Sequence, residues 1–149
     1  MERQPPRCTY LLLMVGADNH EPIEGQIRLQ KLMFLLEKEI LEKRMAITDE
    51  GYDFSQHAFM PFSEDVLDDL ELLKDLGLVK IEGEKIRLTE KGLEVLRNVL
   101  RKDARLRALM KYIEAIKARW NREPEKLSKY ICVKYPHYIE KSLIKYLVK

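Results

Sequence analysis

Six carboxylate side chains gather in one short stretch, and paired carboxylates are a common basis of acid–base catalysis. Asp65 and Asp69 are four residues apart, so they share one face of a helix. Acid–base chemistry also requires burial and a shifted pKa, and here Leu and Val take the inward positions. We therefore expect a solvated acidic face, made of Glu64, Asp65, Asp68, Asp69, Glu71 and Asp75.

The remaining reactive residues form no recognisable catalytic or metal-binding pattern. His20, His57 and His137 are scattered, and none has a metal-like partner three or four residues away. No H-E-x-x-H, G-x-S-x-G or G-x-x-x-x-G-K-[ST] motif occurs. Cys8 and Cys132 are far apart and form no C-x-x-C pair, so they are either small buried hydrophobes or a bridge tying the two ends together. We expect no enzymatic activity, no metal and no cofactor.

Charge is divided unevenly along the 149 residues, although the formal net charge is only +2. Residues 1–96 hold 12 Lys and Arg against 20 Asp and Glu, a net charge of −8. Residues 97–149 hold 15 Lys and Arg against 5 Asp and Glu, a net charge of +10. Such asymmetry indicates either an anionic partner for the basic end or two halves that neutralise each other, within one molecule or across a dimer.

The basic residues concentrate in "RNVLRKDARLRALMKYIEAIKARWNR", where several are four apart and so stack on one side of a helix. Such a surface is sufficient to bind nucleic acid through its phosphates, with help from two residues of a neighbouring hairpin. An ordinary solubilising face is the alternative. The candidate nucleic-acid-binding residues are Lys85, Arg87, Arg97, Arg101, Lys102, Arg105, Arg107, Lys111, Lys117, Arg119 and Arg122.

The acidic stretch has the opposite consequence for nucleic acid. Residues 63–75 carry six carboxylates against Lys74 alone, a net charge of −5. DNA has one negative charge per roughly 1.7 Å of its axis and repels such a helix from its grooves. We expect this helix to face a basic protein, or the basic C-terminal helices of a second copy, and not to serve as a recognition helix.

Periodicity indicates the elements that position these residues. Apolar residues predict a short buried helix over 8–15, a loop over 16–26 and a central helix over 27–44. Alternation predicts a strand over 52–60, which could add a third strand to the hairpin that follows. The acidic helix, residues 64–76, begins after the cap residue Ser63 and buries apolar residues including Leu76.

The second half begins with a hairpin and continues as helices. Gly77 ends the acidic helix, and strands over 78–81 and 85–88 flank a turn at Gly83. Thr89 caps the next helix. Further helices use the apolar stripes Leu106, Leu109, Met110, Ile113, Ile116 and Trp120, then Leu127, Tyr130 and Ile131 after Pro124, and finally Ile139, Leu143, Ile144 and Leu147.

The fold class expected is α+β and mostly helical. We expect a winged-helix-like core with a short hairpin wing in residues 1–100 and a helical extension in residues 101–149 packed on it. The longest apolar run, "YLLLMV", is far shorter than the roughly 20 residues that cross a bilayer. We expect a cytoplasmic protein, and high Lys and Glu content with few Asn and Gln is typical of a thermophilic source.

The order of motifs resembles the YwgA-like family of small archaeal and bacterial proteins and, more distantly, the Panacea antitoxin domain. The matching segments are "IEGQIRLQKLMFLLEKEI", "YDFSQHAFMPFSEDVLDDLELLKDLGLV" and "IRLTEKGLEVL". Met60 departs from the glycine that the family favours in its turn. The resemblance implies a winged-helix-like fold without established enzymatic activity and, for the antitoxin relatives, neutralisation of a partner protein by contact. The shared residues are fold-forming, so no functional residue carries over.

Two functional hypotheses follow from the sequence. The first is a non-enzymatic winged-helix-type nucleic-acid-binding protein, a transcriptional regulator, that uses the basic C-terminal helices and wing. The second is a protein-interaction module, antitoxin-like or dimer-forming, that uses the acidic helix.

Overall fold

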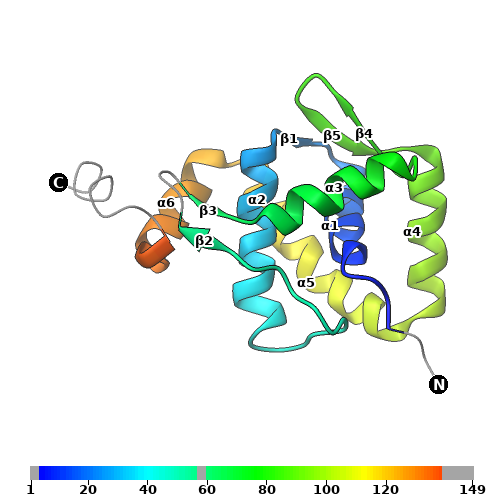
Figure 1. Ribbon diagram of the computed structural model, residues 1–149, viewed down its shortest axis with the longest axis horizontal. Helices are drawn as coiled ribbons and strands as arrows, with labels where there is room; N and C mark the ends of the chain where they lie inside the picture. Colours follow the sequence, from blue (N-terminus) through cyan, green and yellow to red (C-terminus); the bar gives the residue numbers. More distant parts are fainter. Residues whose placement is uncertain (1–3, 57–59, 139–149) are drawn as a thin grey trace.

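The computed structural model describes residues 4–56 and 60–138, and it is an α+β structure built mostly of helices (Figure 1). The helical elements are α1 (Cys8–His20), α2 (Gln26–Leu35), the π-helical η1 (Leu36–Leu41), α3 (Glu64–Asp75), α4 (Glu90–Lys102), α5 (Ala104–Trp120), α6 (Pro124–Lys134) and the 3-10 turn η2 (Pro136–Tyr138). The strands are β1 (Ile23–Glu24), β2 (Ser55–Gln56), β3 (Pro61–Phe62), β4 (Val79–Glu82) and β5 (Lys85–Leu88).

Helix α1 is the centre of the core, with α3, α4 and α5 around it (Figure 1). Every residue from Thr9 to Ala17 is buried, as expected for a helix that is apolar on all sides. The predicted helix over 8–15 is therefore confirmed. Beyond it, Ala17, Asp18 and Asn19 leave helical geometry within the bounds of α1.

Helix α2 continues directly into a π-helical segment, η1, which the sequence did not indicate. The predicted apolar stripe is buried as expected, at Leu29, Leu32, Met33, Leu36 and Ile40. Single π-helical turns are rare and often lie at functional sites. Here Glu39 of η1 accepts hydrogen bonds from Tyr130 and Lys134 of α6.

The three-stranded antiparallel sheet has the order β1-β5-β4. The predicted hairpin is confirmed, with Gly83 at a φ of 63° in its turn. The prediction that residues 52–60 supply the third strand is wrong, because β1, from the predicted loop, pairs with β5 through Ile23 opposite Ile86. Ile23 gains complete burial there.

The segment predicted as that third strand follows another course. Its residues Ser55 and Gln56 pair with β3 in a separate two-stranded sheet. The Phe54 ring packs edge-on against Phe34 of α2, at 5.2 Å between centroids. The Tyr52 hydroxyl donates to Asp69 of α3, at 2.7 Å. These contacts hold the segment against α2 and α3, and its residues 57–59 lie outside the described part.

Helix α3 begins differently from the prediction and ends as predicted. Ser63 precedes it, but the buried Ser63 hydroxyl makes no hydrogen bond to the described residues. Instead, the buried amide of Gln30 binds the Ser63 backbone on both sides, donating to its carbonyl at 2.9 Å and accepting from its N–H at 3.0 Å. At the other end, Gly77 has a φ of 75°, and the N–H groups of Gly77 and Leu78 donate to the carbonyls of Lys74 and Leu73.

Thr89 joins the hairpin to α4 through both side chain and backbone. Its hydroxyl accepts from the N–H of Gly92 at 2.9 Å, which confirms the predicted cap, and donates to the carbonyl of Gly77 at 2.6 Å. Gly92 passes so close to the Leu78 backbone that a Cβ there would overlap the Leu78 carbonyl. Thr89 and Gly92 of the matching segment "IRLTEKGLEVL" therefore each have a structural role.

The C-terminal helices share the core with α1. Of the predicted stripe of α5, Met110 is half-buried and the others are buried, namely Leu106, Leu109, Ile113, Ile116 and Trp120. Helix α5 packs against α1. Pro124 opens α6, whose Leu127 and Ile131 are also buried. The last predicted helix, over residues 139–147, lies outside the described residues. In the described part of the chain, the helices lack the length and apolar character needed to span a membrane.

Candidate functional site

The eleven basic residues predicted to bind nucleic acid fall into three groups. One is buried: Lys117. Three are paired with carboxylates: Arg87 with Glu82 at 3.2 Å, Arg105 with Asp103 at 2.9 Å, and Arg122 with Glu21 at 3.3 Å and Asp18 at 3.8 Å. The others are exposed, namely Lys85, Arg97, Arg101, Lys102, Arg107, Lys111 and Arg119.

The prediction of Lys117 as a surface residue is wrong, because its side chain is 0% exposed. Its ammonium donates to the backbone carbonyls of Val15 at 2.8 Å and Ala17 at 2.7 Å. These lie where α1 leaves helical geometry and Asp18 takes a φ of 55°. Burial lowers the pKa of Lys117 to about 8, although Asp18 and Glu114 act in the opposite direction. Lys117 therefore satisfies backbone carbonyls at the C-terminal end of the regular part of α1.

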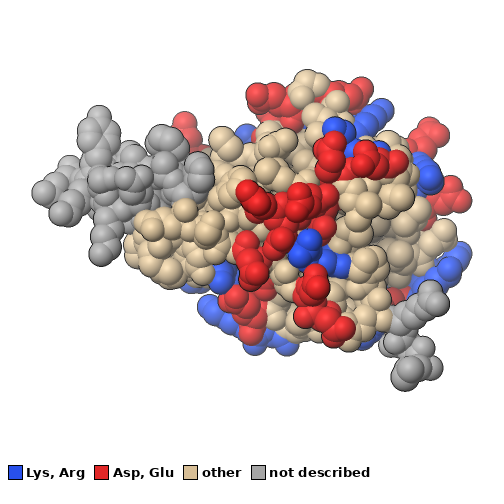
Figure 2. Space-filling view, in the orientation of Figure 1, with Lys and Arg blue, Asp and Glu red and all other residues tan. Residues whose placement is uncertain are grey.

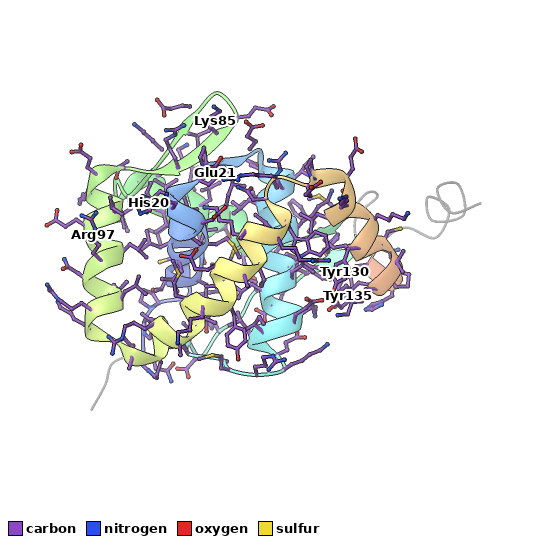
Figure 3. The ribbon with its side chains drawn as sticks, turned by 180° about the vertical axis from the view of Figure 1, so that it is seen from behind. His20, Glu21, Lys85, Arg97, Tyr130 and Tyr135 are labelled. Atoms are coloured by element: carbon purple, nitrogen blue, oxygen red, sulfur yellow. The ribbon has the colours of Figure 1, made fainter. Side chains whose placement is uncertain are left out.

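Five of the exposed cations lie on the second half of α4 and the first half of α5, and we call them the basic corner: Arg97, Arg101, Lys102, Arg107 and Lys111. None of the five makes an ion pair with a carboxylate in residues 4–56 and 60–138. Arg107 donates to the carbonyls of Leu100 and Arg101 at the end of α4, at 2.7 and 2.9 Å, which places it beside Arg101. Figure 3 shows Arg97 projecting from the outer side of α4.

The exposed face of α5 is shallow and free of carboxylates. Its small residues Ala104, Ala108, Ala115 and Ala118 are exposed together with Arg107, Lys111 and Arg119. The only carboxylate of α5, Glu114, is half-buried and accepts the N–H of Asp18 at 2.6 Å. Because alanine side chains are short, another chain can approach this helix closely while meeting only positive charge.

The expectation that all six carboxylates of the acidic helix lie in water is wrong for Asp69, which is 6% exposed. Arg7 binds it with two parallel hydrogen bonds of 2.9 and 3.1 Å, and the Tyr52 hydroxyl donates to it at 2.7 Å. Asp65 is half-buried at 3.6 Å from the same Arg7. The hydrogen bond to Asp69 raises the pKa of Arg7, which keeps its guanidinium charged. Asp69 is therefore a structural residue.

The outer side of α3 keeps the other acids and adds two apolar side chains. Glu64, Asp68, Glu71 and Asp75 are exposed. Leu72 is 44% exposed and Leu76 is 48% exposed, so the prediction that Leu76 faces inward is wrong. Leu76 follows the last residue of α3 and directly precedes the turn at Gly77. Figure 2 shows Asp and Glu gathered on the face that α3 crosses.

A polar cluster between η1 and α6 was not predicted. One oxygen of Glu39 accepts hydrogen bonds from Tyr130 at 2.7 Å, Tyr135 at 2.9 Å and Lys134 at 2.9 Å. Tyr130 of α6 and Tyr135, the residue after α6, both point toward η1 at the end of α2 (Figure 3). The only sequence signal for this cluster is that Tyr130 and Lys134 are one helical turn apart. The π-helical η1, which orients Glu39 toward them, has no recognisable sequence pattern.

The protonation states of this cluster disfavour acid–base catalysis. Burial alone would raise the pKa of Glu39, but the three hydrogen bonds outweigh it and hold that pKa below its usual value. Hydrogen bonds to Tyr130 and Glu39 raise the pKa of Lys134, and burial raises that of Tyr135. Each pKa moves away from neutral pH, whereas proton transfer works best with a pKa near it.

The other candidate reactive residues are dispersed. Cys8 and Cys132 are free and half-buried, so no bridge joins them. His20 and His137 are exposed, and His57 lies outside the described residues. In residues 4–56 and 60–138, no three His, Cys, Asp or Glu side chains are grouped so as to hold a metal ion.

Comparison of the chain with protein-family models, curated proteins and solved structures found no match.

Proposed function

We propose that this chain is a non-enzymatic, winged-helix-like nucleic-acid-binding protein that acts as a transcriptional regulator. The order helix, strand, helix, helix and hairpin, with β1 added beside β5, supports the winged-helix assignment. The resemblance to the YwgA-like family, based on sequence motifs, implies the same fold. Fold alone does not establish function, so the functional proposal depends on the charged surfaces.

The observation that carries the proposal is the basic corner. Five exposed cations lie together on two consecutive helices without a carboxylate partner among the described residues. Phosphate binding requires such a surface and little else. In a winged helix, α3 would occupy the position of the recognition helix, but its outward acids oppose a groove contact. We therefore assign the contact to α4 and α5. Lys85 lies on the hairpin, away from the turn between α4 and α5 (Figure 3), and is not part of this contact.

The test is a salt titration of binding to a DNA duplex with the variant Arg101→Glu/Lys111→Glu. Arg107 is left intact because its guanidinium donates to the Leu100 and Arg101 carbonyls at the end of α4. Losing two phosphate contacts should reduce the magnitude of the slope of log K against log salt by about 1.8. This corresponds to roughly 60-fold weaker binding at about 0.1 M salt. The matched control is Lys126→Glu/Lys129→Glu on α6, which changes net charge equally and should bind with the wild-type slope.

An equal loss in both variants would show that only net charge matters and would refute a localised contact. Unchanged binding in the Arg101→Glu/Lys111→Glu variant would remove the basic corner from consideration. Circular dichroism of both variants, with thermal melts, establishes that each is folded before binding is compared.

A second function, protein contact through α3, is supported by the exposure of Leu72 and Leu76. Leu72 and Leu76 lie one turn apart on an otherwise acidic outer face, where their exposure to water is unfavourable. Burial of both side chains against a partner surface would be favourable. Solvated helix faces normally carry polar side chains at such positions. Contact between α3 and a protein of complementary charge accounts for both the acids and the leucines.

A further inference from the structure

The outer side of α3 combines exposed leucines with negative charge. We call it the acidic strip: Asp68, Glu71, Leu72, Asp75 and Leu76. Asp68, Leu72 and Leu76 follow one another at intervals of four residues and so form one ridge along the helix. Glu71 and Asp75 form a second ridge beside it. Two cations lie close to the strip: Lys74 contacts Glu71 at 3.5 Å, and Lys91 donates to the Leu76 carbonyl at 3.1 Å. Asp68 and Asp75 make no ion pair with a described residue. The surface that fits this strip has shallow apolar positions flanked by cations.

The exposed face of α5 has that composition. Ala104 and Ala108 are four residues apart, the same interval as Leu72 and Leu76, and both are exposed. Lys111 continues along the same face. Arg107 lies one turn before Lys111, and its guanidinium donates to the Arg101 carbonyl at 2.9 Å. Leucine side chains of one helix can pack over the alanines of the other, because small residues allow two helices to approach closely. The carboxylates of the strip would then lie opposite the cations of the basic corner.

Within one chain these surfaces do not meet. Helix α1 lies between α3 and α5 and packs against both. Figure 1 shows α3 crossing in front of α1, with α5 on the other side of it. The acidic strip therefore points away from the basic corner of its own molecule, and only a second molecule brings the two together.

We infer that the acidic strip of one copy binds the basic corner of a second copy. This inference rests on the proposed function in one respect: self-association covers the cations assigned to nucleic acid, so the two contacts exclude each other. The strip of α3 is small beside interfaces that bury about 1,200 Å² or more, so the association is weak and needs high protein concentration. It is also salt-dependent, because exposed charges are screened within about 10 Å at 0.1 M salt.

Sedimentation velocity over a range of protein concentrations, at low and at high salt, tests the inference. The wild-type chain, of 17.7 kDa, should form larger species at low salt and dissociate as salt rises. The variants Asp68→Lys/Asp75→Lys and Arg101→Glu/Lys111→Glu should each remain monomeric alone. An equimolar mixture of the two should associate again, because the first retains a wild-type basic corner and the second a wild-type acidic strip.

Matched controls carry the same charge changes elsewhere. Glu90→Lys/Glu94→Lys on α4 and Lys126→Glu/Lys129→Glu on α6 should associate like the wild type. A wild-type chain that stays monomeric at every concentration and salt overturns the inference. So do variants that associate alone, or a mixture of the two that does not associate.

Nucleic-acid binding is measured separately, so that the two proposals can fail independently. The Asp68→Lys/Asp75→Lys variant should bind a duplex at least as tightly as the wild type, because its basic corner is intact and no longer covered. Self-association without any duplex binding refutes the proposed function alone. Duplex binding without self-association refutes this inference alone.

Discussion

Replacing Lys117 by Met tests the assignment of this residue to the core. The two side chains are similar in length, but Met removes the ammonium that binds the carbonyls of Val15 and Ala17. Each unsatisfied carbonyl costs roughly 1–3 kcal/mol, whereas removal of a buried charge is favourable. These effects oppose each other at neutral pH. The informative quantity is therefore the pH dependence of the difference in unfolding free energy between the two proteins.

That dependence has a definite sign. Folding lowers the pKa of Lys117 from 10.5 to about 8. Between these values, the unfolded chain holds a proton that the folded chain has lost, so rising pH favours the folded state. The stabilisation is complete above the unfolded pKa and disappears as pH falls through the folded pKa. At 1.36 kcal/mol for each pKa unit, it amounts to about 3 kcal/mol.

Urea denaturation at intervals from about pH 7.5 to pH 10.5 measures this effect, with reductant present to protect the cysteines. Burial raises the pKa values of Cys8 and Tyr52, which lowers stability as pH rises, but this contribution is common to both proteins and cancels in their difference. The wild type should gain about 3 kcal/mol relative to the Met variant across the range. A difference that does not change with pH would mean that Lys117 is solvated, and would refute its placement.

Three further substitutions test other contacts by thermal and urea denaturation. Asp69→Asn should lower stability by about 3 kcal/mol, because it leaves the Arg7 guanidinium without its buried counter-charge. Gly92→Ala should destabilise by several kcal/mol, since the new Cβ overlaps the Leu78 carbonyl, and a wild-type melting temperature would contradict that close approach. Thr89→Ala should cost about 1 kcal/mol for the lost helix cap, so a loss below measurement error would show that the cap contributes nothing.

Local features of the chain were predictable where neighbouring residues decide them. The turn at Gly77, the hairpin around Gly83 and the cap at Thr89 depend on residues within a few positions of each other, and all three were predicted correctly. The buried stripes of α2 and α5 followed from periodicity for the same reason. The expected cap at Ser63 failed because a distant residue, Gln30, takes the backbone groups that a local cap would have served.

The charged residues of the candidate site also differ in whether local sequence or distant partners decide their role. The uneven charge along the chain and the basic face of α5 were predictable, because they follow from residue order and helical periodicity alone. It could not show that Asp69 would be neutralised by Arg7 or that Lys117 would be buried against α1, since these partners are 62 and 100 or more residues away.

Tertiary structure therefore decided which charges are structural and which remain available. A charged side chain at a helix boundary between core and solvent can enter the interior only if a partner from another element offsets its desolvation. For Asp69 the partners are Arg7 and Tyr52, and for Lys117 they are two backbone carbonyls released by the end of α1. The sequence determined the helices and their charge, and only the packing of α1 among α3, α4 and α5 separated the acidic strip from the basic corner.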